Sequence, residues 1–361
     1  MGKKILKIVS VILLLIIAIL IAAPFFLEAK IGNIIKNNVN KNVNAILDFS
    51  EADLSLFSSF PNAEVKFKDL VLINKAPFEG DTLFKANTLD LTMGIMQLFK
   101  GTEDAIAINN IYLDGALLNV VVDKDENANY DITVVPENTT VEETTSADGF
   151  SFDLQTYEIS DSRIYYIDKS TGITFKLDDF QHKGTGDLSL ATSELDTHTD
   201  ALVSFEMDSV NYLNKNKLKL DALIGIDLNQ NKYSFLKNEA LVNQLPLVFD
   251  GFVIVNDANQ EIDLTFKTPS SDFKNFLGVI PEIYSKNIEN VTTTGDFIVN
   301  GNFNGIVDDT HIPKFNIEIK SDNASFKYPD LPKAVRNVFF DIQLNNKTGI
   351  AEDTYVDINK A

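Results

Sequence analysis

Most of this chain alternates apolar and polar residues with a period of two. Ala63, Val65 and Phe67 alternate with charged residues, and the same pattern returns in ALVSFEMDSV, LKLDALIGIDL and EIDLTFKT. Successive side chains of a strand point to opposite faces, so each segment has one apolar and one polar face. The pattern predicts a mainly β protein with a long, twisted antiparallel meander. Parallel strands are usually connected by helices, and the sequence lacks such helices.

Three segments interrupt the alternation. LTMGIMQLF, near residues 92–99, predicts a strand that runs into a short helix, and residues 272–287 predict a helix that is broken or kinked at Pro281. Residues 136–149 have no periodicity and predict a flexible linker or loop. This segment divides an N-terminal β region (49–135) from a longer one (150–361).

The first residues predict a membrane anchor. Three lysines precede an apolar run, Ile8–Leu27, and about 20 apolar residues suffice to cross a bilayer. We therefore expect a single transmembrane helix within residues 1–27, with the N-terminus in the cytoplasm and the bulk of the chain across the membrane. A cleaved signal peptide is the alternative, since Ala22 and Ala23 are small, but the run exceeds the roughly 7–15 residues of a signal core.

Residues 28–48 predict an amphipathic helix directly after the anchor. Its apolar residues recur at helical spacing, and they are Ile31, Ile34, Ile35, Val39, Val43, Ile46 and Leu47. Such a helix covers the core of the following domain or lies at the bilayer surface, and both roles are compatible.

Composition and motifs argue against several classes of function. The 52 acidic and 31 basic residues give a net charge of −21, which repels nucleic acid. The chain has no cysteine, and its three histidines (His182, His198 and His311) lie far apart in the sequence. Acid pairs such as Asp178 and Asp179 are typical of a solvated face. We therefore expect a protein without enzymatic activity and without a cofactor.

One segment resembles a calcium loop. In DKDENANYD, oxygen-bearing residues alternate as calcium ligands do, namely Asp123, Asp125, Asn127, Asn129 and Asp131. The glycine at position six and the glutamate at position twelve of such a loop are missing. The alternation on either side favours a hairpin whose Asp and Asn side chains stabilise the turn, and we expect no metal there.

The order of these elements resembles the N-terminal region of the AsmA family, in its Bacteroidetes form. The resemblance covers residues 1 to about 135 and rests on the segments DLSLFSSFP, DLVLIN…PFEGDTLFKANTLDL and IYLDGALLNVVVD. The segment YPDLPKAVRNVFFDIQL, residues 328–344, is also similar. This resemblance implies an inner-membrane protein of outer-membrane biogenesis whose periplasmic part forms a taco-like β-groove. Related bridge-like proteins are proposed to carry phospholipid along such grooves.

The residues are consistent with a groove of this kind. A sheet with one apolar face must bury that face, and this chain offers few helices to cover it. We expect acyl chains of membrane lipids to contact inward-facing residues, and the candidates are Phe67, Phe175, Phe205, Ile224, Phe252 and Phe266. The alternative is a closed sandwich or barrel that side chains fill alone.

Two functions follow from these alternatives. The first is a passive conduit for phospholipid between membranes. The second is a structural or regulatory partner of envelope proteins in outer-membrane protein assembly, acting through exposed strand edges. A hydrolase of envelope glycans is disfavoured, because nothing places two carboxylates in one cleft. The resemblance implies a longer chain with further β repeats, and the final residues, YVDINKA, lie inside an alternating segment, so we expect this chain to be a piece of a longer protein.

Overall fold

The computed structural model describes residues 32–133 and 150–360, except residues 34, 38, 57, 58, 100–105, 257, 270, 278–290, 309 and 331. The predicted anchor (1–27) and linker (136–149) therefore lie outside the described residues. Within the described part, no helix has the length and apolar character needed to span a bilayer.

The described residues are mainly β, as the alternation predicted, with nineteen strands and a few short helices. They form two compact units, residues 1–162 (unit 1) and 163–361 (unit 2). The boundary falls inside strand β7 (Phe150–Asp168), and not in the loop that precedes it, because the first half of β7 pairs with a strand of unit 1.

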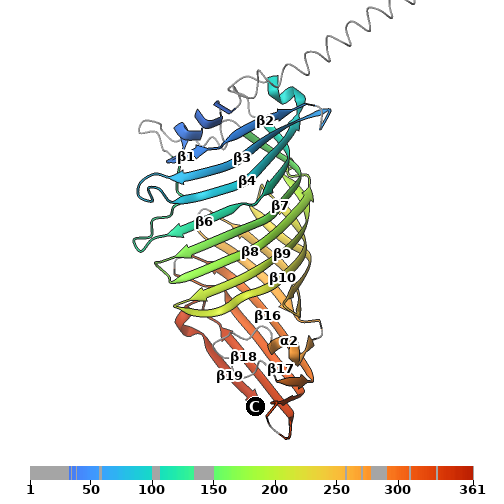
Figure 1. Ribbon diagram of the computed structural model, residues 1–361. Coiled ribbons are helices and arrows are strands. Elements are labelled where there is room, and N and C mark those ends of the chain that lie inside the picture. Colours follow the sequence, from blue (N-terminus) through green and yellow to red (C-terminus); the bar gives the residue numbers. More distant parts are fainter. Residues whose placement is uncertain are drawn as a thin grey trace, which may run out of the picture. The chain divides into compact units, whose positions relative to one another are not determined.

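The described part of unit 1 begins with a helix that packs on the start of its sheet (Figure 1). Described residues between 32 and 42 are helical, so the predicted helix over 28–48 ends earlier than expected and residues 45–48 form a strand. The remaining elements of this unit are β1 (Ala45–Asp48), β2 (Glu51–Ser55), β3 (Asn62–Asn74), β4 (Thr82–Gly94), η1 (Ile95–Phe99), β5 (Ile106–Asp114) and β6 (Leu117–Val122). As predicted, β4 runs into a short helix.

One strand pair of unit 1 is parallel, contrary to the expected antiparallel meander. Strands β5 and β6 follow one another along β4, and Gly115 lies between them with φ +60°. Strand β7 then runs parallel to β5, from Phe150 opposite Ile106 to Ser160 opposite Asp114. Two parallel strands need a connection of a dozen residues or more, and the long segment between β6 and β7 is long enough. The sequence predicted no helix in this segment.

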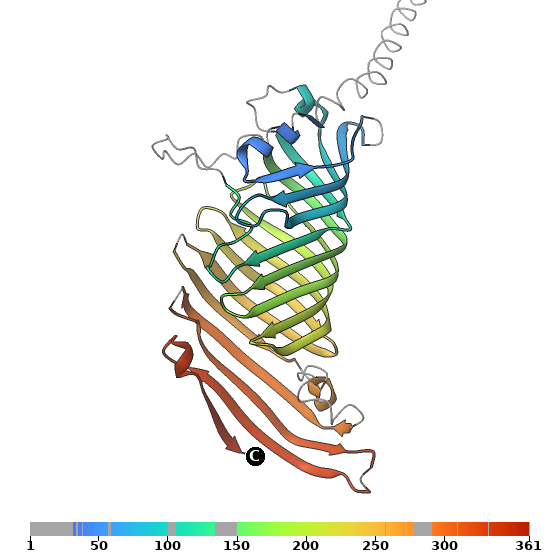
Figure 2. The same ribbon diagram turned by 60° about the vertical axis from the view of Figure 1, so that its left-hand side comes forward.

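Unit 2 is an antiparallel sheet of long strands, whose curvature is visible in Figure 2. Its elements are β8 (Ile173–Gly186), β9 (Thr192–Met207), β10 (Val210–Asp227), β11 (Lys232–Val242), β12 (Leu245–Val255), β13 (Gln260–Lys267), β14 (Ser271–Asp272), α2 (Phe273–Leu277), β15 (Thr292–Thr294), β16 (Asp296–Val307), β17 (Lys314–Lys327), β18 (Val335–Asn346), η2 (Ala351–Asp353) and β19 (Tyr355–Lys360). Strands β8 to β13 pair in sequence, and β13 then pairs directly with β16, so β14, α2 and β15 form an excursion. Of the helix predicted over 272–287, α2 forms the beginning, and residues 278–287 lie outside the described ones.

Candidate functional site

A continuous apolar row crosses unit 2. Directly paired residues on successive strands from β9 to β17 are apolar without interruption, and they are Leu195, Ile224, Phe235, Gly251, Leu264, Phe303 and Phe315. A second row on the same face contains Phe249, Phe266, Gly301, Ile317 and Leu344. Residues paired across a sheet point to the same side, so these rows form one face, which we call the apolar face of unit 2.

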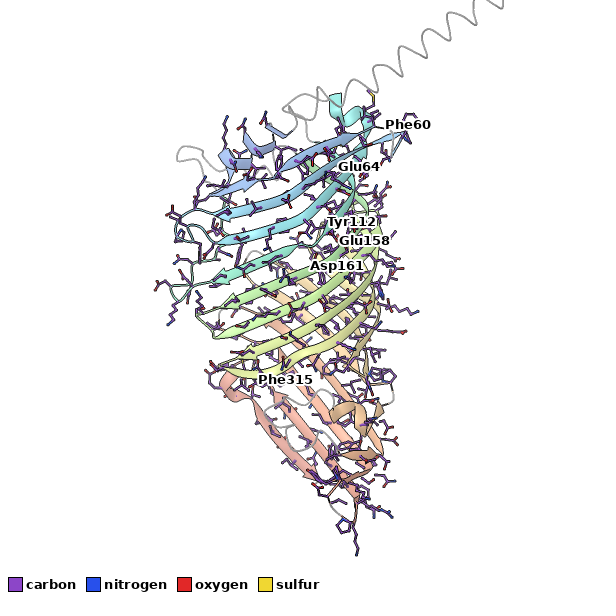
Figure 3. All side chains as sticks on the ribbon, viewed as in Figure 1. Phe60, Glu64, Tyr112, Glu158, Asp161 and Phe315 are labelled. Atoms are coloured by element: carbon purple, nitrogen blue, oxygen red, sulfur yellow. The ribbon has the colours of Figure 1, made fainter. Side chains whose placement is uncertain are left out.

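Aromatic rings contact one another along this face. The ring centroids are 5.5 Å apart for Phe235 and Phe249, and 5.8 Å apart for Phe266 and Phe303. Phe315 continues the series at 5.8 Å from Phe303, and it is labelled in Figure 3. Separations of this size are typical of favourable ring contacts.

These aromatic residues are only half-buried. The buried core cluster of unit 2 in the described part consists of Leu245, Phe273, Phe297 and Ala324, none of which belongs to the two rows. A sheet of this length thus keeps a broad apolar surface in partial contact with solvent, which is unusual unless something else covers it.

The opposite face of unit 2 is polar except on β12, where Val248 lies between Glu239 and Lys267. The residues next to the apolar row on the same strands include Lys183, His198, Asp221, Glu239, Lys267, Asn300 and Glu318. On this face the His198 ring lies 2.6 Å from Asp221 and 2.9 Å from Asp200. Its hydrogen bond with Asp221, reinforced by Asp200, raises the pKa of His198 above its usual value. The two faces therefore differ sharply in chemistry.

Four of the six predicted lining residues lie on the apolar face of unit 2. Phe175 of β8 pairs with Phe205 of β9, and both are half-buried. Ile224 pairs with Phe235, and Phe266 pairs with Phe249. The structure thus places these four residues on one side of one sheet.

Phe252 lies on the polar face. It pairs with Ser234 on one side and with Asp263 on the other, and the Lys232 ammonium lies 4.0 Å from its ring centroid. Its placement by alternation failed because β12 is apolar on both faces around this position, as LVF and FVIV show. A shift of one residue reverses the side to which a strand residue points.

Phe67 belongs to the closed core of unit 1. It is 2 % exposed, and its ring contacts Phe49 edge-on at 5.0 Å between centroids. Ile35 and Val39 of the N-terminal helix pack against this core. The helix therefore covers the core of the domain, which is one of the two roles predicted for it. Phe67 is therefore a packing residue.

On the apolar face of unit 1, side chains become more exposed from β3 and β4 toward β5 and β7. Val65 and Leu91, paired on β3 and β4, are 3 % and 8 % exposed, whereas Ile111 and Tyr157, next in the same row on β5 and β7, are only half-buried. The burial that remains raises the pKa of Tyr157 by removing water from its hydroxyl. The helix thus covers only part of this face.

The apolar face of unit 2 also contains a polar pair, His182 and Thr199, that the alternation did not reveal. Nδ1 of His182 lies 2.8 Å from Oγ1 of Thr199, and its ring stacks on Phe180 at 5.5 Å. Burial lowers the pKa of His182, with a smaller contribution from His198. The imidazole is therefore held in its neutral form more readily than in water, as befits an apolar surface.

The calcium-like segment is organised by its own side chains. The Asp123 carboxylate accepts hydrogen bonds from the backbone N–H groups of Asp125 (2.8 Å) and Asn127 (2.9 Å). Asn129 is 1 % exposed, and its Oδ1 accepts from the N–H of Val121 at 2.9 Å. An antiparallel bridge between Val122 and Ala128 closes the turn as predicted for a hairpin, although the described residues near Asp131 form no regular second strand. Those residues include no group of three His, Cys, Asp or Glu side chains suited to a metal ion.

Comparison with protein families supports one assignment. The model of the AsmA family matches residues 1–234, which is more than half of the chain. Neither the curated proteins nor the solved structures gave a match. The matched region contains all of unit 1 and the first strands of unit 2, including part of its apolar face. This chain belongs to the AsmA family.

Proposed function

We propose that this protein binds phospholipid acyl chains on the apolar face of unit 2 and conducts them between the membranes of the cell envelope. The observation that carries the proposal is the row from Leu195 to Phe315, which is half-buried at every position except the buried Leu195 and spans successive strands without a charged residue. Acyl chains are the natural cover for such a surface in an envelope protein.

The transport step requires no chemistry from the protein. An acyl chain that leaves a bilayer for water loses about 0.8 kcal/mol per methylene group, and an apolar surface recovers much of that cost. A face that continues from strand to strand offers similar contacts along its length, so a lipid can move without crossing a polar barrier. In this proposal the residues 1–27 anchor the chain in the inner membrane, with both units in the periplasm.

A second candidate function is that of a non-transporting partner in outer-membrane protein assembly. Strand β19 favours it, because Val356 and Ile358 are 58 % and 64 % exposed. An exposed strand with apolar side chains is a common site for the addition of a partner strand. The two functions differ in whether lipid occupies the apolar face.

Lipid occupancy tests the proposal. We would extract the full chain from its host membrane in mild detergent and measure bound phospholipid by native mass spectrometry. The unmodified chain is expected to retain phospholipid, and the double variant Phe266→Asp and Phe303→Asp is expected to lose most of it. Phe252→Asp, on the polar face, is the matched control and also corrects for lipid around the anchor. Equal lipid content in all three proteins would instead favour the partner role.

A further inference from the structure

The two most exposed large apolar side chains of the described residues lie in unit 1. Met96 is 72 % exposed and Phe60 is 68 % exposed. Phe60 lies in the connection between β2 and β3, and Met96 lies in η1 after β4. Since Asn62 pairs with Gly94 at the start of β3 and the end of β4, both residues lie at the same end of the sheet. Figure 3 shows Phe60 at this end, beyond Glu64 on β3.

The backbone that carries these side chains is tied to the sheet. The Ser59 hydroxyl donates to Glu64 at 2.8 Å, and the Asn62 N–H donates to the Ser59 carbonyl at 2.7 Å. In η1, the side-chain oxygen of Gln97 accepts a hydrogen bond of 3.2 Å from the N–H of Ala107 on β5. The exposure of Phe60 and Met96 therefore belongs to a built surface, and not to a loop without contacts.

The described residues around Phe60 and Met96 are uncharged. Residues 59–63 and 94–97 contain no charged side chain, although 23 % of the whole chain is charged, and Lys100, Glu103 and Asp104 lie outside the described residues. A surface that is uncharged and apolar suits a lipid interface better than water. We call Phe60, Met96 and the uncharged described residues around them, 59–63 and 94–97, the apolar tip.

The N-terminal helix enters unit 1 from the side of this tip. Its Asn40 bonds to Leu47, its Lys36 ammonium donates to the Phe49 carbonyl at 3.0 Å, and Gly32 lies against Phe49 and Ala52. The helix therefore runs antiparallel to β1 and β2, and β2 leads directly into the connection that holds Phe60. The beginning of the helix, which follows the apolar segment Ile8–Leu27 in the sequence, thus lies toward the apolar tip.

We propose that the apolar tip is a bilayer-contact surface that inserts Phe60 and Met96 into the interfacial region of the membrane in which the chain is anchored. This inference rests on the anchor of the proposed function. Two large apolar side chains on fixed loops, next to the entry point of the chain, would orient unit 1 against that membrane.

The absence of cysteine allows a direct test with single labels. We would prepare full-length Phe60→Cys and Met96→Cys, label each with an environment-sensitive fluorophore, and reconstitute them in phosphatidylcholine vesicles, with and without phosphatidylglycerol. Glu79→Cys is the matched control, because Glu79 is exposed in the turn between β3 and β4 at the other end of the sheet. Thermal unfolding of each variant would verify that the fold is retained.

Lipids that carry a quencher near the headgroup are expected to quench the labels at positions 60 and 96 at least about threefold more than the label at position 79. Iodide in the water is expected to quench these two labels at least about threefold less than the label at position 79. Protection from iodide without quenching by lipid would indicate a protein contact and overturn the proposal. Vesicle-bound protein with equal quenching at all three positions would overturn the tip while leaving the anchor intact. Protein that does not float with vesicles would overturn both.

Discussion

The ring of Phe266 lies directly over Gly301 on the neighbouring strand. The two residues pair across β13 and β16, and a Cβ atom on Gly301 would lie 2.4 Å from the ring carbons. The absence of a side chain at Gly301 therefore lets the Phe266 ring lie flat along the apolar face, where it stacks on Phe303.

Gly301→Ala should destabilise the protein by about 1–2 kcal/mol, because the added methyl group displaces the Phe266 ring from its contacts. Urea unfolding of the full chain in mild detergent measures this change. Gly225→Ala is the control, since its nearest contact would be 3.4 Å from Leu236, and it should alter stability by less than about 0.5 kcal/mol. Equal stability of both variants would show that the ring moves at no cost.

Gly115 is required by the junction of β5 and β6. Its φ of +60° is unfavourable for other residues, and a Cβ there would lie 1.9 Å from the Asn87 side chain. We expect Gly115→Ala to destabilise unit 1 by about 2 kcal/mol or more, through strain and overpacking. Hydrogen exchange of the amides in β4 and β5 would detect this loss, and unchanged protection of these amides would contradict it.

Asp90 should be replaceable without loss. Burial raises the pKa of this carboxyl despite its ion pair with Lys66 at 3.0 Å, so the ionised form is less favourable in the fold than in water. The folded pKa exceeds the unfolded one, so the stabilising contribution is present at low pH and is lost as pH rises through the folded pKa. Asp90→Asn is therefore expected to leave stability unchanged or raise it by up to about 1 kcal/mol at pH 7.

Unfolding of Asp90→Asn at pH 7 and pH 3 would check this expectation, with Asp53→Asn on the same face as the control, because the Asp53 side chain is 42 % exposed and that of Asp90 only 14 %. The gain should disappear at the lower pH, where the native carboxyl is protonated. A loss of several kcal/mol at pH 7 would mean that the ion pair outweighs the cost of burial.

His182 and His198 should titrate on opposite sides of the ordinary histidine pKa of about 6.5. Burial lowers the pKa of His182, so its contribution to stability is lost as pH falls below 6.5 toward the folded pKa. The carboxylates of Asp221 and Asp200 raise the pKa of His198, so its contribution is present below 6.5 and is lost as pH rises through the folded pKa. NMR titration of the imidazole protons, assigned with His182→Gln and His198→Gln, measures both. The same pKa for the two rings would contradict their placement on different faces.

The sequence predicted the strands well because alternation is a local property. Phe175, Phe205, Ile224 and Phe266 were assigned to one face from their own segments, and their pairing places them there. Alternation cannot fix the side of Phe252, whose strand is apolar on both faces. The unassigned rings Phe303 and Phe315 lie in equally regular strands, so the same reasoning would have found them.

Pairing between distant strands is not a local property, and the parallel pair of β5 and β7 was missed for that reason. The segments IAINNIYLD and FSFDLQTYEI have the alternation of any strand and carry no mark of direction. The end of the N-terminal helix was missed because Ile46 and Leu47 suit both a helical face and a strand. Only the pairing of Ile46 with Ile73 and of Leu47 with Leu72 shows that these residues belong to strand β1.

Site-specific crosslinking to lipid tests the central claim most directly. A photoreactive phenylalanine analogue would replace Phe266, Phe303 or Phe252 in the full chain, and illumination in the host cell would be followed by mass spectrometry of the crosslinked lipid. The lipid-conduit account predicts phospholipid adducts at positions 266 and 303 and several-fold fewer at position 252. Adducts of equal yield at all three positions, or none at positions 266 and 303 with efficient crosslinking to protein, would contradict it.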